Sequence, residues 1–144
     1  MTFLERYLEL KKQGRLHELQ ALIPYASVVG FETETDDKGL VTVLRQKESN
    51  IGNTQIPAVH GGVVGSLLEH SALMTVMWGQ DLTAFPKIVN VSIDYLRPAI
   101  GTKDTFARGS LVKQGRTVSN VRVEAWQDDE NKLVAAAHCH ILTG

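Results

Sequence analysis

One short segment of the chain combines the residue types that can activate a carbonyl group. His60 is followed by Gly61 and Gly62, and the carboxylate of Glu69 comes nine residues after the histidine. Glycines let other groups approach the backbone closely, and the amides that begin a helix lack intrahelical partners and carry partial positive charge. Such amides can polarise a carbonyl and stabilise the oxyanion that forms on attack. Two adjacent glycines alone are more typical of a tight, closely packed turn.

Glu69 is the candidate group for acid–base work. It lies within an apolar stretch, about two helical turns beyond the glycines. A buried carboxylate without a partner is costly, so Glu69 must form a pair, reach a cleft or lose its charge. At a cleft it would suit a general base; the alternatives are an exposed helix face or a pair with His70 or Arg97. We assign a structural hydrogen bond to His60, and packing or an interface to His70, which lies on another helix face.

The elements that must position these residues follow from the apolar pattern. Residues 62–78 are apolar on most sides, which predicts a buried helix that ends at Gly79. Helical spacing predicts two short N-terminal helices, the second of which ends at Pro24. Residues 48–58, which precede the buried helix, have the composition of a loop. Strand patterns flank the helix and cover residues 27–35, 40–45, 87–97, 104–114, 117–127 and 132–142.

This order of elements predicts an α+β fold in which a curved antiparallel sheet wraps around one central helix. Short links between the last four strands favour antiparallel neighbours. We expect one domain over residues 1–144, with residues 1–24 as an N-terminal helical extension. A single sheet with one helix leaves free edges and a partly bare core. Two copies joined edge to edge would cover both, so we predict a homodimer.

The bulk composition argues against several classes of protein. The chain has 144 residues, of which 43% are hydrophobic and 22% charged, and its net charge is −1. This balance gives no support for nucleic acid as a partner. No apolar run reaches the roughly 18 residues that span a bilayer, and the charged N-terminus is unlike a signal peptide, so we expect no membrane partner and a cytoplasmic location. The lone Cys139, flanked by His138 and His140, predicts neither a disulfide nor a metal site.

The chain resembles the PaaI-type hotdog-fold acyl-CoA thioesterases. The histidine and two glycines at 60–62, with a carboxylate at 69, resemble that family's signature. Residues 94–99 (DYLRPA) resemble the end of its third strand and residues 112–117 (VKQGRT) its next turn, so the resemblance covers roughly residues 26–142. It implies the hotdog fold, homodimers often paired into homotetramers, and hydrolysis of acyl-CoA or aroyl-CoA thioesters without a cofactor.

The resemblance also implies a role for each residue of the signature. The N–H of Gly61 or Gly62 would bind the thioester carbonyl. Glu69 stands where the family usually has Asp, and would activate water or attack directly from the neighbouring subunit. The family commonly has Asn six residues before the motif His; this chain has Thr54 there, with Asn53 one position earlier as a possible substitute.

The remaining site predictions concern the two ends of the substrate. Arg97, Lys113 and Arg116, each near a strand end, are the candidate cations for the anionic CoA portion. We expect helix residues that include Met74 and Met77 to shape the acyl pocket, although methionines are more often core residues.

Two other functions fit the same pattern. Hydratase or dehydratase chemistry on a hotdog fold would use His60 and Glu69 as an acid–base pair. A non-catalytic acyl-CoA-binding protein would explain why Thr54 and Glu69 depart from the family pattern.

Overall fold

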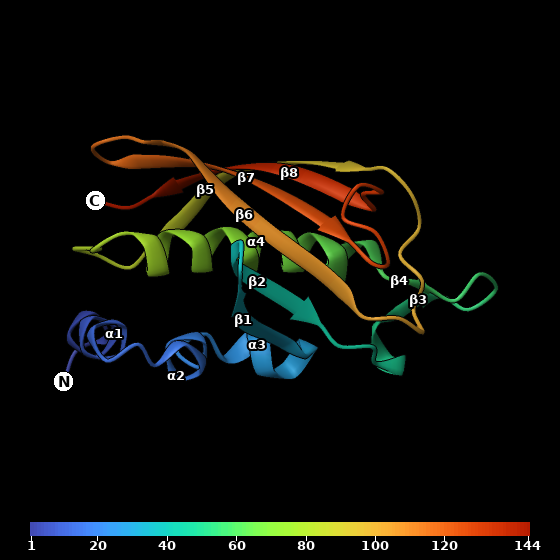
Figure 1. Cartoon of the computed structure of the whole chain (residues 1–144), viewed down its shortest axis with the longest axis horizontal. Coiled ribbons are helices and arrows are strands. Elements are labelled where there is room, and N and C mark those ends of the chain that lie inside the picture. The colour runs from blue at the N-terminus through green and yellow to red at the C-terminus, as the bar shows by residue number, and fades with distance from the viewer.

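A long central helix and one antiparallel sheet organise the fold. The computed structural model describes residues 1–144. Helix α4 (Gly61–Gly79) runs along the molecule, with strands β5 to β8 over one side of it and the β1–β2 hairpin curving around to the other (Figure 1). This arrangement confirms the predicted α+β fold with a curved sheet around a central helix, and α4 ends at Gly79 as expected.

The sheet has six antiparallel strands in the order β1-β2-β6-β7-β8-β5. Strands β1 and β5 are therefore its two edges, and β5 lies beside the last strand of the chain. The strand pairs shift register between Ile88 and Asn90 of β5 and between Leu111 and Lys113 of β6. The strands are β1 (Phe31–Asp36), β2 (Gly39–Leu44), β5 (Lys87–Tyr95), β6 (Thr105–Gln114), β7 (Val118–Trp126) and β8 (Ala135–Leu142).

The main core fills the space between the sheet and α4. Leu67, Leu68 and Ala72 of the helix have no exposed surface, and they share one apolar cluster with the inner residues of β7 and β8. Gly109 of β6 lets the helix approach the sheet, because a Cβ there would lie 2.2 Å from Oγ1 of Thr75. A helix that is apolar on most sides is buried in this way, which is why its pattern was readable from the sequence.

A second apolar cluster joins the N-terminal helices α1 (Phe3–Lys12) and α2 (Leu16–Gln20) to the far end of α4. Tyr7 and Leu10 of α1 pack there against Met74 and Met77. The Tyr7 hydroxyl donates to the main-chain oxygen of Met77 at 2.6 Å, and the Lys11 ammonium donates to that of Gln80. These bonds occupy carbonyls that the end of a helix leaves free.

Two segments differ from the sequence prediction. Helix α3 (Pro24–Val29) includes residues 27–29, the predicted start of a strand, because Pro at the first helical position is pre-organised and Gly30, with φ of 99°, provides a left-handed cap. The predicted loop at 48–58 contains a short 3-10 helix, η1 (Glu48–Asn50), and a hairpin of β3 (Ile51–Asn53) and β4 (Ala58–Val59). None of the helices is long and apolar enough to span a membrane.

Candidate active site

His60 fixes the backbone at the point where α4 begins. Its main-chain N–H donates to the carbonyl of Asn50 at 2.8 Å. Strand β3 comes so close here that a Cβ on Gly52 would lie 2.8 Å from the His60 Cα. As the N-cap of α4, His60 accepts the amide of Gly62 on its ring Nδ1 at 2.9 Å. A ring nitrogen that accepts carries no proton, so we assign the proton of the neutral ring to Nε2.

Among the first amides of α4, only that of Gly61 has no partner. The Gly62 amide donates to the His60 ring, and the amides of Val63 and Val64 donate to the His60 carbonyl at 2.9 and 3.1 Å. Gly61 itself is exposed. The helix therefore presents one free N–H at its positive end, which is the arrangement that can hold a carbonyl oxygen or an oxyanion.

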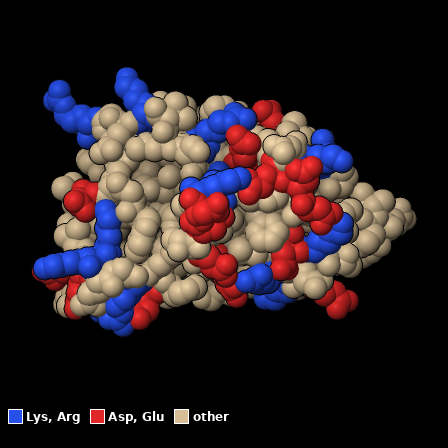
Figure 2. All heavy atoms as spheres, viewed as in Figure 1, with Lys and Arg blue, Asp and Glu red and all other residues tan.

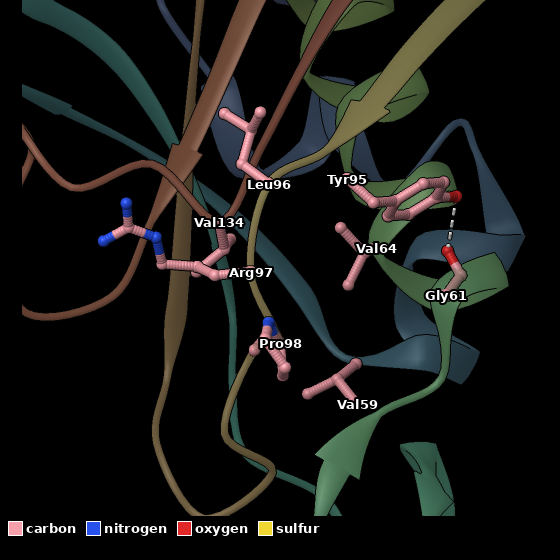
Figure 3. Close-up of a pocket in the computed structure, with 9 residues that line it drawn as sticks. Val59, Gly61, Val64, Tyr95, Leu96, Arg97, Pro98 and Val134 are labelled. Atoms are coloured by element: carbon pink, nitrogen blue, oxygen red, sulfur yellow. Dashed lines mark hydrogen bonds between the residues drawn. The ribbon is translucent and has the colours of Figure 1, made fainter.

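Tyr95, at the end of β5, packs over this turn. Its hydroxyl donates to the Gly61 carbonyl at 2.9 Å (Figure 3). Gly65, one turn further along α4, makes room for it, because a Cβ there would lie 3.2 Å from the Tyr95 hydroxyl and 3.3 Å from Ile93. Tyr95 is not among the site residues predicted from the sequence, although it lies within the DYLRPA segment that carries the family resemblance.

A largely apolar pocket of about 410 Å³ opens beside the Gly61 amide. Figure 3 shows the Arg97 guanidinium on the side of this pocket away from Gly61. Apolar walls with a few polar groups at fixed places are typical of a small-molecule site. The pocket is lined by Val59, Gly61, Val64, Tyr95, Leu96, Arg97, Pro98, Ala99 and Val134. The expected contributions of Met74 and Met77 are absent from this lining because both side chains are buried against α1.

Glu69 lies on the same strip of α4 as the site glycines but outside this pocket. Gly61, Gly65 and Glu69 are spaced by four residues, so they share one helix face, and Gly65 contacts β5. Glu69 is half-buried and forms no hydrogen bond or ion pair in the chain, so neither of the considered pairings, with His70 or Arg97, is present. Its negative charge acts on Cys139 of β8, whose thiol pKa is raised to about 11, mainly by burial and then by Glu69.

His70 faces the opposite direction, toward α2 and β1. Its Nε2 lies 3.3 Å from Oε1 of Gln20, and its ring packs on Phe31 with centroids 5.1 Å apart. Burial lowers the pKa of His70 to about 4, so the ring is neutral at physiological pH. The prediction that His70 is a packing residue agrees with these contacts.

Asn53, the possible substitute for the family's Asn, bonds to its own turn instead of lying at the Gly61 amide. Asn53 is exposed in the β3–β4 turn, where its Oδ1 accepts the amides of Gln55 at 3.0 Å and Ile56 at 3.4 Å. This side chain stabilises its own turn and has no contact with Gly61. Thr54 beside it is exposed.

The three candidate cations are not gathered within one chain. Arg97 comes two residues after Tyr95, the last residue of β5. When the strand register is followed from β5 across β8 and β7 to β6, Tyr95 lies at the same level as Ala107. Lys113 lies six residues beyond Ala107, about 20 Å along the strand, and Arg116 follows in the β6–β7 turn. All three side chains are exposed and none forms a salt bridge.

Comparison with known proteins shows the family to which the chain belongs. Residues 51–141 match the family model of the acyl-CoA thioesterase N-terminal domain, so the chain belongs to the acyl-CoA thioesterase family. It is 35% identical to a solved protein from Chromobacterium violaceum, with a TM-score of 0.79 and coverage of 97% of both chains. No curated protein sequence matches the chain.

Two further solved structures share the hotdog fold. A phenylacetic acid degradation-related protein from Ralstonia eutropha is 27% identical, with a TM-score of 0.72 over 83% of this chain and 89% of that one. A Bacillus halodurans protein solved with CoA is 21% identical, with a TM-score of 0.75 over 97% of this chain and 92% of that one. The fold prediction is thus confirmed, and the family match supports a thioester hydrolase in general terms.

Proposed function

We propose that the protein hydrolyses acyl-CoA or aroyl-CoA thioesters by PaaI-type chemistry, at sites formed between two copies of the chain. The observation that carries this proposal is the single unpaired amide of Gly61 at the edge of an apolar pocket. A free helix-start amide beside an apolar cavity is suited to an acyl group whose carbonyl develops negative charge. Residues 1–144 act as one hotdog domain in this proposal, with residues 1–24 as its extension.

Gly61, and not Gly62, is the carbonyl donor in this proposal. The sequence alone did not show which of the two glycines binds the carbonyl. The Gly62 amide already donates to His60 Nδ1 at 2.9 Å, so using it would require breaking that bond. His60 then serves as the cap that shapes the turn, with its Nε2–H free to face the substrate.

The acid group must come from a second copy of the chain. Gly61 and Glu69 are eight positions apart on the helix, a rise of about 12 Å, which is several times the reach of a hydrogen bond. One chain therefore cannot bring both groups to one thioester. Glu69 of a partner can meet Gly61 if two α4 helices run antiparallel beside each other.

The edge strand β5 provides the surface for this pairing. Its outer edge has no strand neighbour, and Val89 and Tyr95 of the strand are more than half exposed, as is Leu96 just after it. Gly65 is the midpoint between residues 61 and 69, and it abuts Ile93 and Tyr95 of this strand. A two-fold axis at the level of Gly65 would set each Gly61 beside the partner's Glu69, and would give two equivalent sites per dimer.

The chemistry then needs no further group. Glu69 of one subunit takes a proton from water as the hydroxide adds to the thioester carbon, and the Gly61 N–H of the other subunit stabilises the resulting oxyanion. The C–S bond breaks as the carbonyl re-forms, and the proton passes from Glu69 to the departing thiolate. Direct attack by Glu69 would use the same geometry, with an acyl-enzyme anhydride that water cleaves.

The same pairing brings the candidate cations together. Because a two-fold axis reverses the ends of the sheet, Lys113 and Arg116 of one subunit come to the end that carries Arg97 of the other. Figure 2 shows basic side chains projecting at the end of the molecule where the β6–β7 turn lies in Figure 1. A patch assembled in this way would bind the CoA phosphates. Pairing of two such dimers would give the tetramer that the resemblance implies.

A panel of acyl- and aroyl-CoAs with thiol detection tests the activity, and crotonyl-CoA hydration tests the hydratase alternative. We expect Glu69→Gln to reduce kcat at least about 100-fold, because it removes the base or nucleophile. Thioester binding without turnover on any member would favour the non-catalytic alternative and refute the proposed hydrolysis.

Mixed dimers test whether the site is shared. A dimer of one E69Q chain and one G61P chain keeps one intact site, made of the first chain's Gly61 and the second chain's Glu69. Unfolding and refolding an equal mixture of the two inactive variants should restore roughly a quarter of the wild-type activity, because half of the dimers are mixed and each has one of two sites. No recovery in verified mixed dimers would show that each site lies within one chain.

A further inference from the structure

We infer that Tyr95 is a positioning residue for the carbonyl-binding amide, through a hydrogen-bond relay that ends on His60. This inference rests on the proposed function and adds a residue to its machinery. The Tyr95 hydroxyl donates to the Gly61 carbonyl at 2.9 Å. That carbonyl belongs to the same peptide unit as the Gly62 N–H, which donates to His60 Nδ1 at 2.9 Å. One peptide plane is thus held at both of its polar atoms by side chains.

This clamp adds to the bonds that hold the preceding peptide, whose His60 carbonyl accepts the amides of Val63 and Val64. Gly61 and Gly62 are both exposed, lack side chains, and are the residue type with the greatest conformational freedom. The Gly61 amide has no internal partner, so its peptide is held at only one of its two polar atoms, the His60 carbonyl. Since a donor to a developing oxyanion must be held within about 0.5 Å of its productive position, a second anchor on the adjoining peptide limits the remaining rotation at Gly61.

The packing around Tyr95 shows that room is kept for this contact. A Cβ on Gly61 would lie 3.8 Å from the Tyr95 ring, so the ring rests against that residue. Gly65 leaves the space that the hydroxyl occupies, since a Cβ there would come within 3.2 Å of it. Tyr95 is 57% exposed, yet its phenol points inward to the turn instead of to solvent (Figure 3). Hydrogen bonds linked through one peptide also strengthen each other.

Tyr95→Phe removes the hydroxyl and keeps the ring, and Tyr25→Phe is its matched control. Tyr25 is 52% exposed, and its hydroxyl also reaches α4, 3.4 Å from the Ser66 hydroxyl, but it is not part of the relay. We expect Y95F to lower kcat about tenfold with KM changed less than twofold, since a displaced donor weakens transition-state binding. Y25F should leave both parameters within about twofold of the wild type, because it removes no relay bond.

An NMR measurement tests the relay without any turnover. In ¹⁵N-labelled protein, Y95F should shift the amide nitrogen of Gly62, because its peptide loses the bond to the carbonyl, and Y25F should leave that resonance unchanged. If Y95F resembles Y25F in either kcat or the Gly62 resonance, the inference is refuted. If the wild type cleaves no thioester, the proposed function fails instead, and the resonance still shows whether the relay exists.

Discussion

Gly61→Pro is the sharpest single test of the carbonyl donor, because it replaces the free N–H with a ring carbon and breaks no internal hydrogen bond. Gly61 is the first residue of α4, the helical position at which proline is favoured. The preceding residue, His60, has φ of −56° and ψ of 133°, which lies in the region that precedes proline. No internal hydrogen bond is lost, since the Gly61 amide donates to nothing in the chain.

The expected loss of kcat follows from the number of free amides at the start of α4. The next three amides are all committed to His60, so no other helix-start N–H can replace the lost one. Removal of one oxyanion donor costs about 100- to 1000-fold in kcat, or roughly 2.7–4 kcal/mol of transition-state stabilisation. Folding stability should rise by about 0.4–1 kcal/mol, because proline restricts the unfolded chain at a compatible position.

Gly61→Ala is the matched control, since it adds a side chain but keeps the N–H. Its Cβ would lie 3.8 Å from the Tyr95 ring, an ordinary contact. Steady-state hydrolysis of one good acyl-CoA should give G61A a kcat within about threefold of the wild type, with G61P far below both. Thermal melts establish that both variants are folded. A folded G61P with the same kcat as G61A would show that this amide does not bind the carbonyl.

Three further predictions concern neighbouring features. Gly65→Ala should push the Tyr95 hydroxyl off its carbonyl and lower kcat several-fold, while the melting temperature stays level or rises because alanine favours helix by about 1 kcal/mol; a lower melting temperature with unchanged kcat would contradict this. The pKa of His70, about 4 when folded, lies below its ordinary value of 6.5, so the unfolded chain binds a proton that the folded chain does not. Stability should therefore be full above pH 6.5 and fall by about 2–3 kcal/mol as the pH drops toward 4, a loss that urea melts should find reduced in His70→Gln. Arg97→Ala should raise KM for acyl-CoA several-fold and reduce its salt dependence with kcat little changed; an unchanged KM would remove Arg97 from the CoA site.

The sequence predicted the large elements because their patterns are strong. Residues 62–78 are apolar around the whole helix, and the last four strands have clear links between them. Helix α3 was misassigned because Val28 and Val29 favour strands, while the proline start and the Gly30 cap decide the outcome. Strands β3 and β4 are too short for any periodicity to be visible.

The residue types of the site could be predicted from the sequence, but the hydrogen bonds between them could not. The sequence placed Glu69 about two helical turns beyond the glycines on the same helix. The choice between the two glycines required the direction of the His60 ring, which no sequence pattern reveals. Tyr95 was missed because its bond joins residues 34 apart in the chain, and Asn53 could not be excluded from contact with Gly61 until its turn was seen.

The open edge of β5 has a consequence for how such an enzyme behaves at low abundance. In the proposed dimer each chain supplies half of two active sites, so a single chain on its own would be folded but inactive. Turnover per chain would then follow the fraction that is paired and decline steeply once the concentration drops below the dissociation constant of the pair. The rate of hydrolysis would thereby depend on how much of the protein the cell makes, because the unpaired edge of β5 must find a partner.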